Sequence, residues 1–178
     1  MRIIAGALKG RRIDAPDWPG LRPTSDRLRE TLFNILAPRI QGARFLDGYA
    51  GTGAVGIEAL SRGAAHVTFV ERDPRAVRLI EQNLARCAVK DRYAIIRAGF
   101  TTAAPGLGQR FDILFLDPPY GADEMGASLT AAAHLVAEGG VLILEHARRD
   151  AAPERIERLA RARELLQGDS ALAFYQVP

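Results

Sequence analysis

Asp117, Pro118, Pro119 and Tyr120 are the residues of this chain whose types and order could most directly do chemistry. They follow the apolar stretch 111–116, which predicts a buried strand. Proline fixes its own φ, has no N–H and keeps the preceding residue extended, so the Asp117 carboxylate and the Pro118 carbonyl are held as hydrogen-bond acceptors. Two acceptors beside the Tyr120 ring suit a planar base that carries an exocyclic NH2 group. The alternative is a purely structural Pro-Pro turn.

A second motif is glycine-rich and follows the first predicted strand, which ends near Asp47. The spacing Gly51-x-Gly53-x-x-Gly56 matches the dinucleotide fingerprint, in which glycines let the backbone turn sharply and let a ligand approach closely. Glu71, at the end of the second predicted strand, could bind a ribose diol. The motif alone fits either a nicotinamide cofactor or S-adenosylmethionine.

The position of Asp47 favours S-adenosylmethionine. A carboxylate there would repel a pyrophosphate but attract the ammonium group of S-adenosylmethionine. Hydride transfer also has no use for the run 117–120. Two structural alternatives stay open, because Asp47 could cap the following turn and Glu71 could be a solvated strand end beside Arg72.

The elements that must position these motifs alternate between apolar runs and helical patterns from Arg44 onward, which is typical of a βαβ sheet. We expect most of 98–110 to be loop. In the tail, we expect a short helix near 153–160 and then an antiparallel hairpin that closes the sheet edge. The expected strands are 43–48, 66–71, 93–97, 111–116 and 140–145, the expected helices 54–62, 74–87 and 124–137, and the expected hairpin strands 161–166 and 171–177.

Residues 1–42 follow a different pattern. The segments 2–4 and 11–13 look like a small basic hairpin, and a stretch rich in proline and glycine follows. Thr24 or Ser25 then caps a helix that runs to about Leu36. Because this segment is too small to bury a core alone, we expect it to pack as an extension on a sheet domain formed by 43–178.

Composition narrows the function classes. The 178 residues suffice for one domain, with 48% apolar and 25% charged residues. Cys87 is the only cysteine, which excludes an intrachain disulfide and a cysteine-based zinc site, and the three histidines lack metal-ligand spacing. We expect no metal. Without a run of about 18 apolar residues or a signal-peptide pattern, we expect a cytoplasmic protein and no membrane partner.

Charge is concentrated at the start of the chain. Residues 1–44 hold nine basic and four acidic groups, a net +5, whereas the other 134 residues hold 15 and 17, a net −2. A basic head suggests a polyanionic partner, although 22 of the 24 basic residues are arginine and the chain could simply be arginine-rich. Acidic neighbours of Arg27 and Arg29 also allow a salt-bridged helix face. The candidate phosphate contacts are Lys9, Arg11, Arg12, Arg22, Arg27 and Arg29.

Several segments together identify a family. They are 2–6, 9–12, 22–24, 26–27, 29–34, 50–54, 56–64 and 117–120. With them, the chain closely resembles the bacterial RsmD-type 16S rRNA guanine-N2 methyltransferases over nearly its whole length. The glycine loop and the run 117–120 mark only the broad class of amino-methylating enzymes, and the N-terminal segments with 58–64 narrow it to this family.

The resemblance implies a Rossmann-like class I S-adenosylmethionine-dependent methyltransferase, with a seven-stranded sheet whose last strand is antiparallel. It implies S-adenosylmethionine as methyl donor, S-adenosylhomocysteine as product, and as acceptor a guanine of 16S rRNA on an assembled or partly assembled 30S subunit. Pro23 and Thr24 could close over the methionine end of the donor. Where family members often carry a polar residue for the adenine, this chain has Gly99 and Phe100, so we expect backbone groups and the Phe100 ring there.

The expected chemistry is orientation of a weakly nucleophilic amine. Asp117 and the Pro118 carbonyl would each accept one N–H, and Tyr120 would stack on the base. One compact domain suggests a monomer. The alternatives are a methyltransferase for another planar amine, such as adenine N6 or a protein glutamine, a nicotinamide oxidoreductase, and a non-catalytic rRNA-binding assembly factor.

Overall fold

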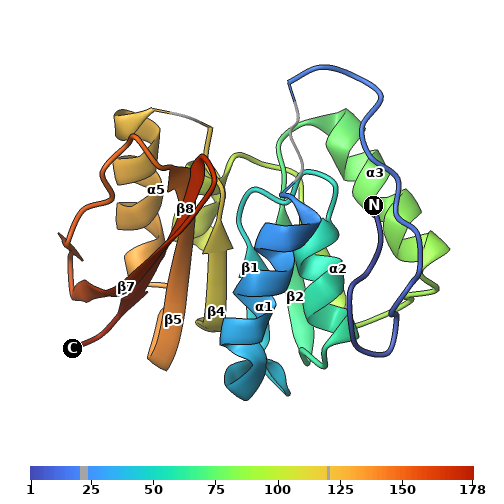
Figure 1. Cartoon of the computed structure of the whole chain (residues 1–178), viewed down its shortest axis with the longest axis horizontal. Helices are drawn as coiled ribbons and strands as arrows, with labels where there is room; N and C mark the ends of the chain where they lie inside the picture. The colour runs from blue at the N-terminus through green and yellow to red at the C-terminus, as the bar shows by residue number, and fades with distance from the viewer. Residues whose placement is uncertain (21–23, 120) are drawn as a thin grey trace.

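The computed structural model describes residues 1–20, 24–119 and 121–178. Within these ranges, eight strands form one sheet in the order β3-β2-β1-β4-β5-β8-β7-β6 (Figure 1). The first five strands are parallel, β8 runs antiparallel between β5 and β7, and β6 pairs with β7 at the edge. The strands are β1 (Arg44–Asp47), β2 (His66–Val70), β3 (Tyr93–Ile96), β4 (Phe111–Leu116), β5 (Val136–Ala147), β6 (Arg155–Ile156), β7 (Leu159–Gln167) and β8 (Ser170–Gln176).

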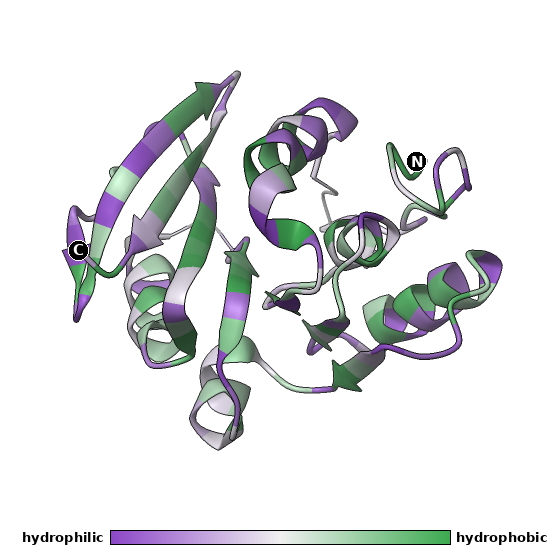
Figure 2. Cartoon of the chain, turned by 90° about the horizontal axis from the view of Figure 1, so that it is seen from below, coloured by the Kyte–Doolittle hydropathy of each residue, from purple (hydrophilic) through white to green (hydrophobic). Residues whose placement is uncertain are grey.

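This arrangement confirms the Rossmann-like class I fold. The expected antiparallel last strand is β8, and the two-residue β6 adds an edge strand to the seven that were expected. Both faces of the sheet are covered, as the view from below shows (Figure 2). The helices are α1 (Asp26–Ile40), α2 (Ala54–Ser61), α3 (Pro74–Arg86), α4 (Phe100–Ala103) and α5 (Ala122–Ala133), with a 3-10 turn at Ala104–Gly106.

Alternate residues of each central strand feed two separate cores. In β4, Ile113 and Phe115 belong to the cluster that also contains buried apolar residues of α1 and α2 and two residues of α3. Leu114 and Leu116 belong to the cluster that contains α5 residues and Phe100. Because both faces are buried, the strand reads as a continuous apolar run rather than as an alternating one.

The tail corrects one prediction. No helix forms near 153–160, where the residues instead make the β6–β7 hairpin, with Ile156 paired to Leu159. Glu157 takes a left-handed φ of 50° in the turn. The hairpin is tied down by the Tyr175 hydroxyl, which donates to the Pro153 carbonyl at 2.8 Å. These long-range contacts override a locally helical pattern.

β5 begins earlier than predicted, and α5 ends earlier. The strand starts at Val136 rather than at residue 140, and its pairing with β4 is irregular, because Phe111 faces Val136 whereas Ile113 faces Val141. Gly139, with a φ of 70°, lies in this bulge. The expected strand 140–145 already included Gly140, and the structure extends it back through Gly139 by way of this irregularity.

The N-terminal segment packs on the sheet through α1 and α2. Ile3 and Ile13 are buried in the same cluster as Phe45 and Phe115. The expected hairpin forms around an antiparallel bridge between Arg2 and Arg12, and the Ile3 N–H donates to the Arg11 carbonyl at 3.0 Å. The buried residues of this segment share one core cluster with those of the sheet, and the boundary at residue 42 stays a prediction.

The helix of this segment is longer than expected. Ser25, not Thr24, caps α1, because its hydroxyl accepts from the Leu28 N–H at 3.2 Å. The helix continues through Pro38 to Ile40, beyond the end expected near Leu36. In the described parts of the chain, none of the helices is long and apolar enough to cross a membrane.

Candidate active site

A cleft of about 880 Å³ opens at the carboxyl ends of the parallel strands. Its lining comes from the ends of β1, β2, β4 and β5, from the segments just before α1 and at the start of α4, and from the β7–β8 turn. Ligands of open α/β sheets bind at this edge, outside the carboxyl ends of the strands. The cleft is therefore the candidate active site.

The glycine loop forms one wall of the cleft. Gly53 has a φ of 78° at the start of α2, a conformation that favours glycine. A Cβ on Gly56 would lie 2.2 Å from Cε1 of Phe69, so this glycine lets α2 approach β2 closely. The fingerprint spacing thus serves both the loop turn and the packing of the helix beneath it.

Asp47, at the end of β1, is hydrogen-bonded to the first turn of α2, directly after the glycine loop. Its side chain is 1% exposed, and Oδ2 accepts from the Gly56 N–H at 3.0 Å. Burial raises the pKa of Asp47 to about 7, the Gly56 hydrogen bond opposes that rise, and the nearby Glu71 charge adds to it. Asp47 also lines the cleft, so the structural cap and a role toward an ammonium group are compatible.

Glu71 joins the end of β2 to the glycine loop. Oε2 accepts from the Gly51 N–H at 2.9 Å, and Oε1 accepts from the Asp73 N–H at 2.8 Å. The side chain is half-buried and lines the cleft, as does the exposed Arg72. A ribose contact by Glu71 stays a prediction, and its loop-bracing hydrogen bonds show that it is not merely a solvated strand end.

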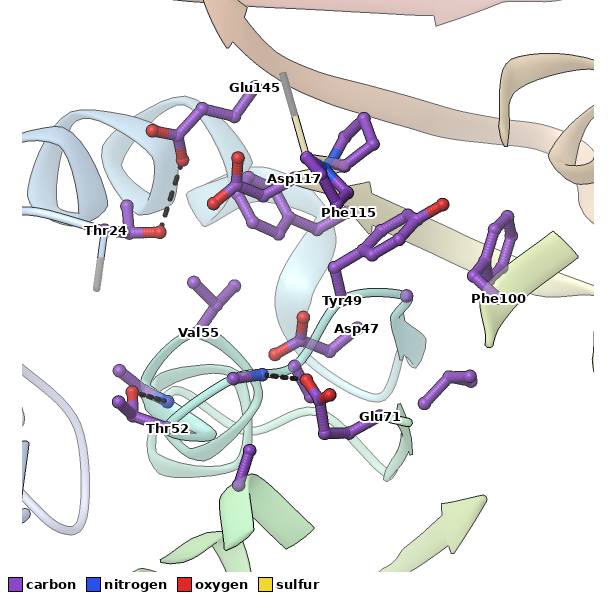
Figure 3. A pocket seen from close by; sticks show the side chains of 18 of the residues that line it. Thr24, Asp47, Tyr49, Thr52, Val55, Glu71, Phe100, Phe115, Asp117 and Glu145 are labelled. Atoms are coloured by element: carbon purple, nitrogen blue, oxygen red, sulfur yellow. Dashed lines mark hydrogen bonds between the residues drawn. The ribbon is translucent and has the colours of Figure 1, made fainter. Parts of the chain in front are cut away.

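The opposite wall carries two carboxylates (Figure 3). β4 and β5 pair Leu116 with Leu144, so the next residues, Asp117 and Glu145, follow side by side. Glu145 is 9% exposed, and the Thr24 hydroxyl donates to its Oε2 at 3.2 Å. Figure 3 shows Asp117, Glu145 and Thr24 together, across the cleft from Glu71.

Asp117, Pro118 and Pro119 follow β4 directly. Pro118 is buried, Pro119 is exposed, and both line the cleft with Asp117. Tyr120 lies outside the described residues. Sequence reasoning missed Glu145, although the signal was there, since it ends the expected strand 140–145 just as Glu71 ends 66–71.

The region expected to hold an adenine contains an aromatic pair, the buried Phe100 and the half-buried Tyr49. Phe100 is 2% exposed, and its ring centroid lies 5.7 Å from that of Tyr49. The Tyr49 hydroxyl donates to Glu124 at 3.1 Å and lies 2.6 Å from the Ser128 hydroxyl, and burial raises its pKa to about 12. Sequence reasoning missed Tyr49, which directly precedes the glycine loop.

Sequence reasoning also missed Trp18, in the segment before α1. Trp18, the only tryptophan of the chain, lines the cleft and lies under the Arg75 guanidinium, which is 5.1 Å from its ring centroid. Arg75 is in turn paired with Asp73 at 2.8 Å. The signal that could have found Trp18 is a lone large aromatic in a polar, proline-rich segment.

The candidate RNA contacts lie in different environments. Lys9, Arg11 and Arg12 are exposed on the N-terminal loop, and Arg11 also donates to the Cys87 carbonyl at 2.7 Å. Arg27 is exposed at the cleft. Arg22 lies outside the described residues.

Arg29 requires a correction. Its side chain is fully buried, donates to the Arg2 carbonyl at 2.6 Å, and is paired with Asp26 at 3.0 Å. Its Nε also lies 3.7 Å from the buried Glu58 carboxylate. The guanidinium is therefore part of the core and is not placed to contact RNA phosphates.

Comparison with known proteins agrees with this geometry. A family model described as "Conserved hypothetical protein 95" matches residues 1–176. "Putative rRNA methyltransferase YlbH" of Bacillus subtilis is 35% identical over 99% of this chain and 98% of its own length. "Ribosomal RNA small subunit methyltransferase D" of Escherichia coli is 44% identical over 67% of this chain, and the match spans 60% of that relative's length.

A solved structure agrees over the whole chain. "Putative methyltransferase yhhF" from Escherichia coli superposes with a TM-score of 0.89 at 31% identity, covering 99% of this chain and 97% of that one. The match to the family model and the 35% identity of the full-length relative both indicate a shared family, and not only a shared fold. The chain belongs to the RsmD methyltransferase family.

Proposed function

We propose that this protein transfers a methyl group from S-adenosylmethionine to the exocyclic N2 amine of a guanine in 16S rRNA, on an assembled or partly assembled 30S subunit. The observation that carries the proposal is the placement of Asp117 across one cleft from Glu71, with Pro118 and the glycine loop in the lining of the same cleft. An amine acceptor site thus faces a nucleoside-type donor site. The names of the relatives and the family resemblance support the rRNA substrate.

The donor end of the cleft consists of Asp47, the loop 51–53 and Glu71. Glu71 would accept from the ribose hydroxyls, a charged hydrogen bond worth about 1.5–3 kcal/mol. Asp47 would face the ammonium group, with Thr24 near the methionine part and Arg72, which follows Glu71, near the nucleoside part. Since the Phe100 ring is packed on Tyr49, backbone groups at 98–100 are better placed than the ring face to meet the adenine.

The acceptor end consists of Asp117, Pro118 and Glu145. Asp117 and the Pro118 carbonyl would each accept one N–H of the amine, which directs the nitrogen lone pair at the methyl group. As the N–C bond forms, the C–S bond breaks and its electrons stay on sulfur, giving S-adenosylhomocysteine. The amine then loses one proton to Asp117 or to water. No step needs a metal.

The target guanine must leave its helical context to enter the cleft. Lys9, Arg11, Arg12 and Arg27 would contact the surrounding phosphates, with Arg22 from the same basic segment. Tyr120 would stack on the base, a contact worth about 1–3 kcal/mol. We further propose that the protein acts as a cytoplasmic monomer.

The test is transfer of a labelled methyl group from S-adenosylmethionine to 30S subunits of a strain that lacks this gene. Wild type, Asp117→Ala and the control Asp112→Ala are compared, with nucleoside analysis of the product. Asp112 lies on the same strand, but its carboxylate accepts from the Arg44 N–H at the far end of the sheet. Label in N2-methylguanosine that only Asp117→Ala abolishes supports the proposal.

Other outcomes overturn it in different ways. Label in N6-methyladenosine would keep the mechanism but replace the acceptor. Binding of NAD in preference to S-adenosylmethionine would indicate an oxidoreductase. Donor binding without transfer to 30S, naked rRNA, DNA or protein would leave an assembly factor.

A further inference from the structure

Glu145 is placed beside the expected acceptor but has no part in the transfer step above. It directly follows Leu144, which pairs with Leu116, the residue before Asp117. Its carboxylate is nine-tenths buried and lines the same cleft. Figure 3 shows it on the same side of the cleft as Asp117.

The chemistry of a guanine edge explains a second carboxylate at this place. Guanine carries an N1–H next to its N2 amine, so it offers adjacent donors along one edge. Adenine has an unprotonated N1 beside its exocyclic amine. A site with only Asp117 and the Pro118 carbonyl would accept any planar amine, whereas a neighbouring carboxylate demands one more donor next to it.

We infer that Glu145 reads the N1–H of the acceptor guanine and so excludes bases whose ring nitrogen is unprotonated. This inference rests on the proposed function. With adenine in place, the carboxylate would face a lone pair, and a buried acceptor left without its donor is costly. Sites built to bond an N–H reject analogues that lack it far more strongly than apolar pockets reject a methylene.

The competing explanation is that Glu145 only anchors the segment before α1 through the Thr24 hydroxyl. That contact is 3.2 Å long, and removing the Thr24 hydroxyl leaves the Glu145 side chain itself in place. Thr24→Val deletes the hydroxyl at nearly constant shape. Because Thr24 is also proposed to lie near the donor, this variant serves as the control for the ratio between acceptor bases and not for the rate itself.

The test uses 30S subunits reconstituted with 16S rRNA that carries, at the modified position, either guanine or 2,6-diaminopurine. The second base keeps the N2 amine but has no N1–H. Wild type and Thr24→Val should methylate guanine about 100-fold faster than diaminopurine. Glu145→Gln, whose amide can also donate, should bring that ratio to within about threefold of unity.

Binding of S-adenosylhomocysteine, measured by calorimetry, shows that each variant is folded. If Glu145→Gln does not fold, Glu145→Asp keeps the carboxylate and should preserve a preference for guanine of at least tenfold. An unchanged ratio in Glu145→Gln, whatever its rate, would overturn the inference, as would a Thr24→Val ratio that falls equally. Wild type that forms no N2-methylguanosine would refute the proposed function itself before any variant is compared.

Discussion

The donor end of the cleft is built from nearby parts of the chain, and the acceptor end is built from distant ones. At the donor end, Asp47 bonds to Gly56 and Glu71 bonds to Gly51, contacts that span nine and 20 residues. At the acceptor end, Glu145 accepts from Thr24, a residue proposed to lie near the methionine part of the donor, across 121 residues. The donor end depends on one loop and its braces, whereas the acceptor end depends on how separate segments pack.

This difference suggests that the donor end determines the cofactor class of the enzyme and that the acceptor end determines substrate specificity. A self-braced glycine loop can serve any enzyme that uses the same donor. Residues gathered from the segment before α1, from β4 and from β5 can vary independently, and they suit discrimination between acceptors. Substitutions at the two ends should therefore affect different measurements.

The largest effect is expected from a substitution that disrupts only the acceptor end. Asp117→Ala should lower the rate of methyl transfer about 10²–10⁴-fold, because positioning and proton acceptance at the amine are lost. Its affinity for S-adenosylhomocysteine should stay within about twofold of wild type. A loss of donor affinity comparable to the loss of rate would contradict the separation of the two ends.

The pH dependence of stability tests the donor end. The pKa of Asp47 is raised from 3.8 to about 7 by burial, so the folded protein binds a proton there that the unfolded chain releases. Stability from this group is fully present below about pH 4 and is lost as pH rises through 7, by up to about 1.4 kcal/mol per unit. Asp47→Asn should remove that loss, as urea unfolding at several pH values without donor would show. Parallel pH profiles would refute the raised pKa.

Packing under the glycine loop gives a smaller effect. Gly56→Ala should cost about 1–3 kcal/mol of stability and weaken donor binding, since the new Cβ meets the buried Phe69 ring at 2.2 Å. The control is Gly126→Ala in α5, where a Cβ meets nothing within 4 Å. That variant should be neutral or up to about 1 kcal/mol more stable. Thermal unfolding and calorimetry measure both, and equal behaviour of the two variants would count against the close approach of α2.

The smallest effect lies outside both ends. Arg11→Ala combined with Arg12→Ala should weaken RNA binding across sequences and lower the slope of log affinity against log salt by about 0.7 per lost contact. Arg29→Ala is not a matched control, because it would damage the core. An unchanged slope would assign Arg11 and Arg12 a structural role.

The same contrast explains what the sequence could predict. Spacing alone located the glycine loop, Asp47 and Glu71, because these act over short stretches whose signals are local. Glu145 was missed although it ends an expected strand, because only the pairing of β5 with β4 brings it beside Asp117. Arg29 was misassigned because its sequence neighbours are charged, whereas its burial depends on Glu58 in another helix. The helix expected near 153–160 failed in the same way, since contacts from β8 determine that segment.

The irregular start of β5 has a consequence for how this family can change. Side chains alternate between the two sides of a strand, so the bulge before Val141 decides which residues of 141–145 face α1. Deleting one residue within 137–140 while the earlier pairing holds would turn Glu145 toward α5 and present its neighbours to the cleft. Insertions or deletions at the start of β5 should therefore preserve substrate choice only when they change its length by an even number of residues. The bulge thus determines which side chains of β5 face the acceptor site.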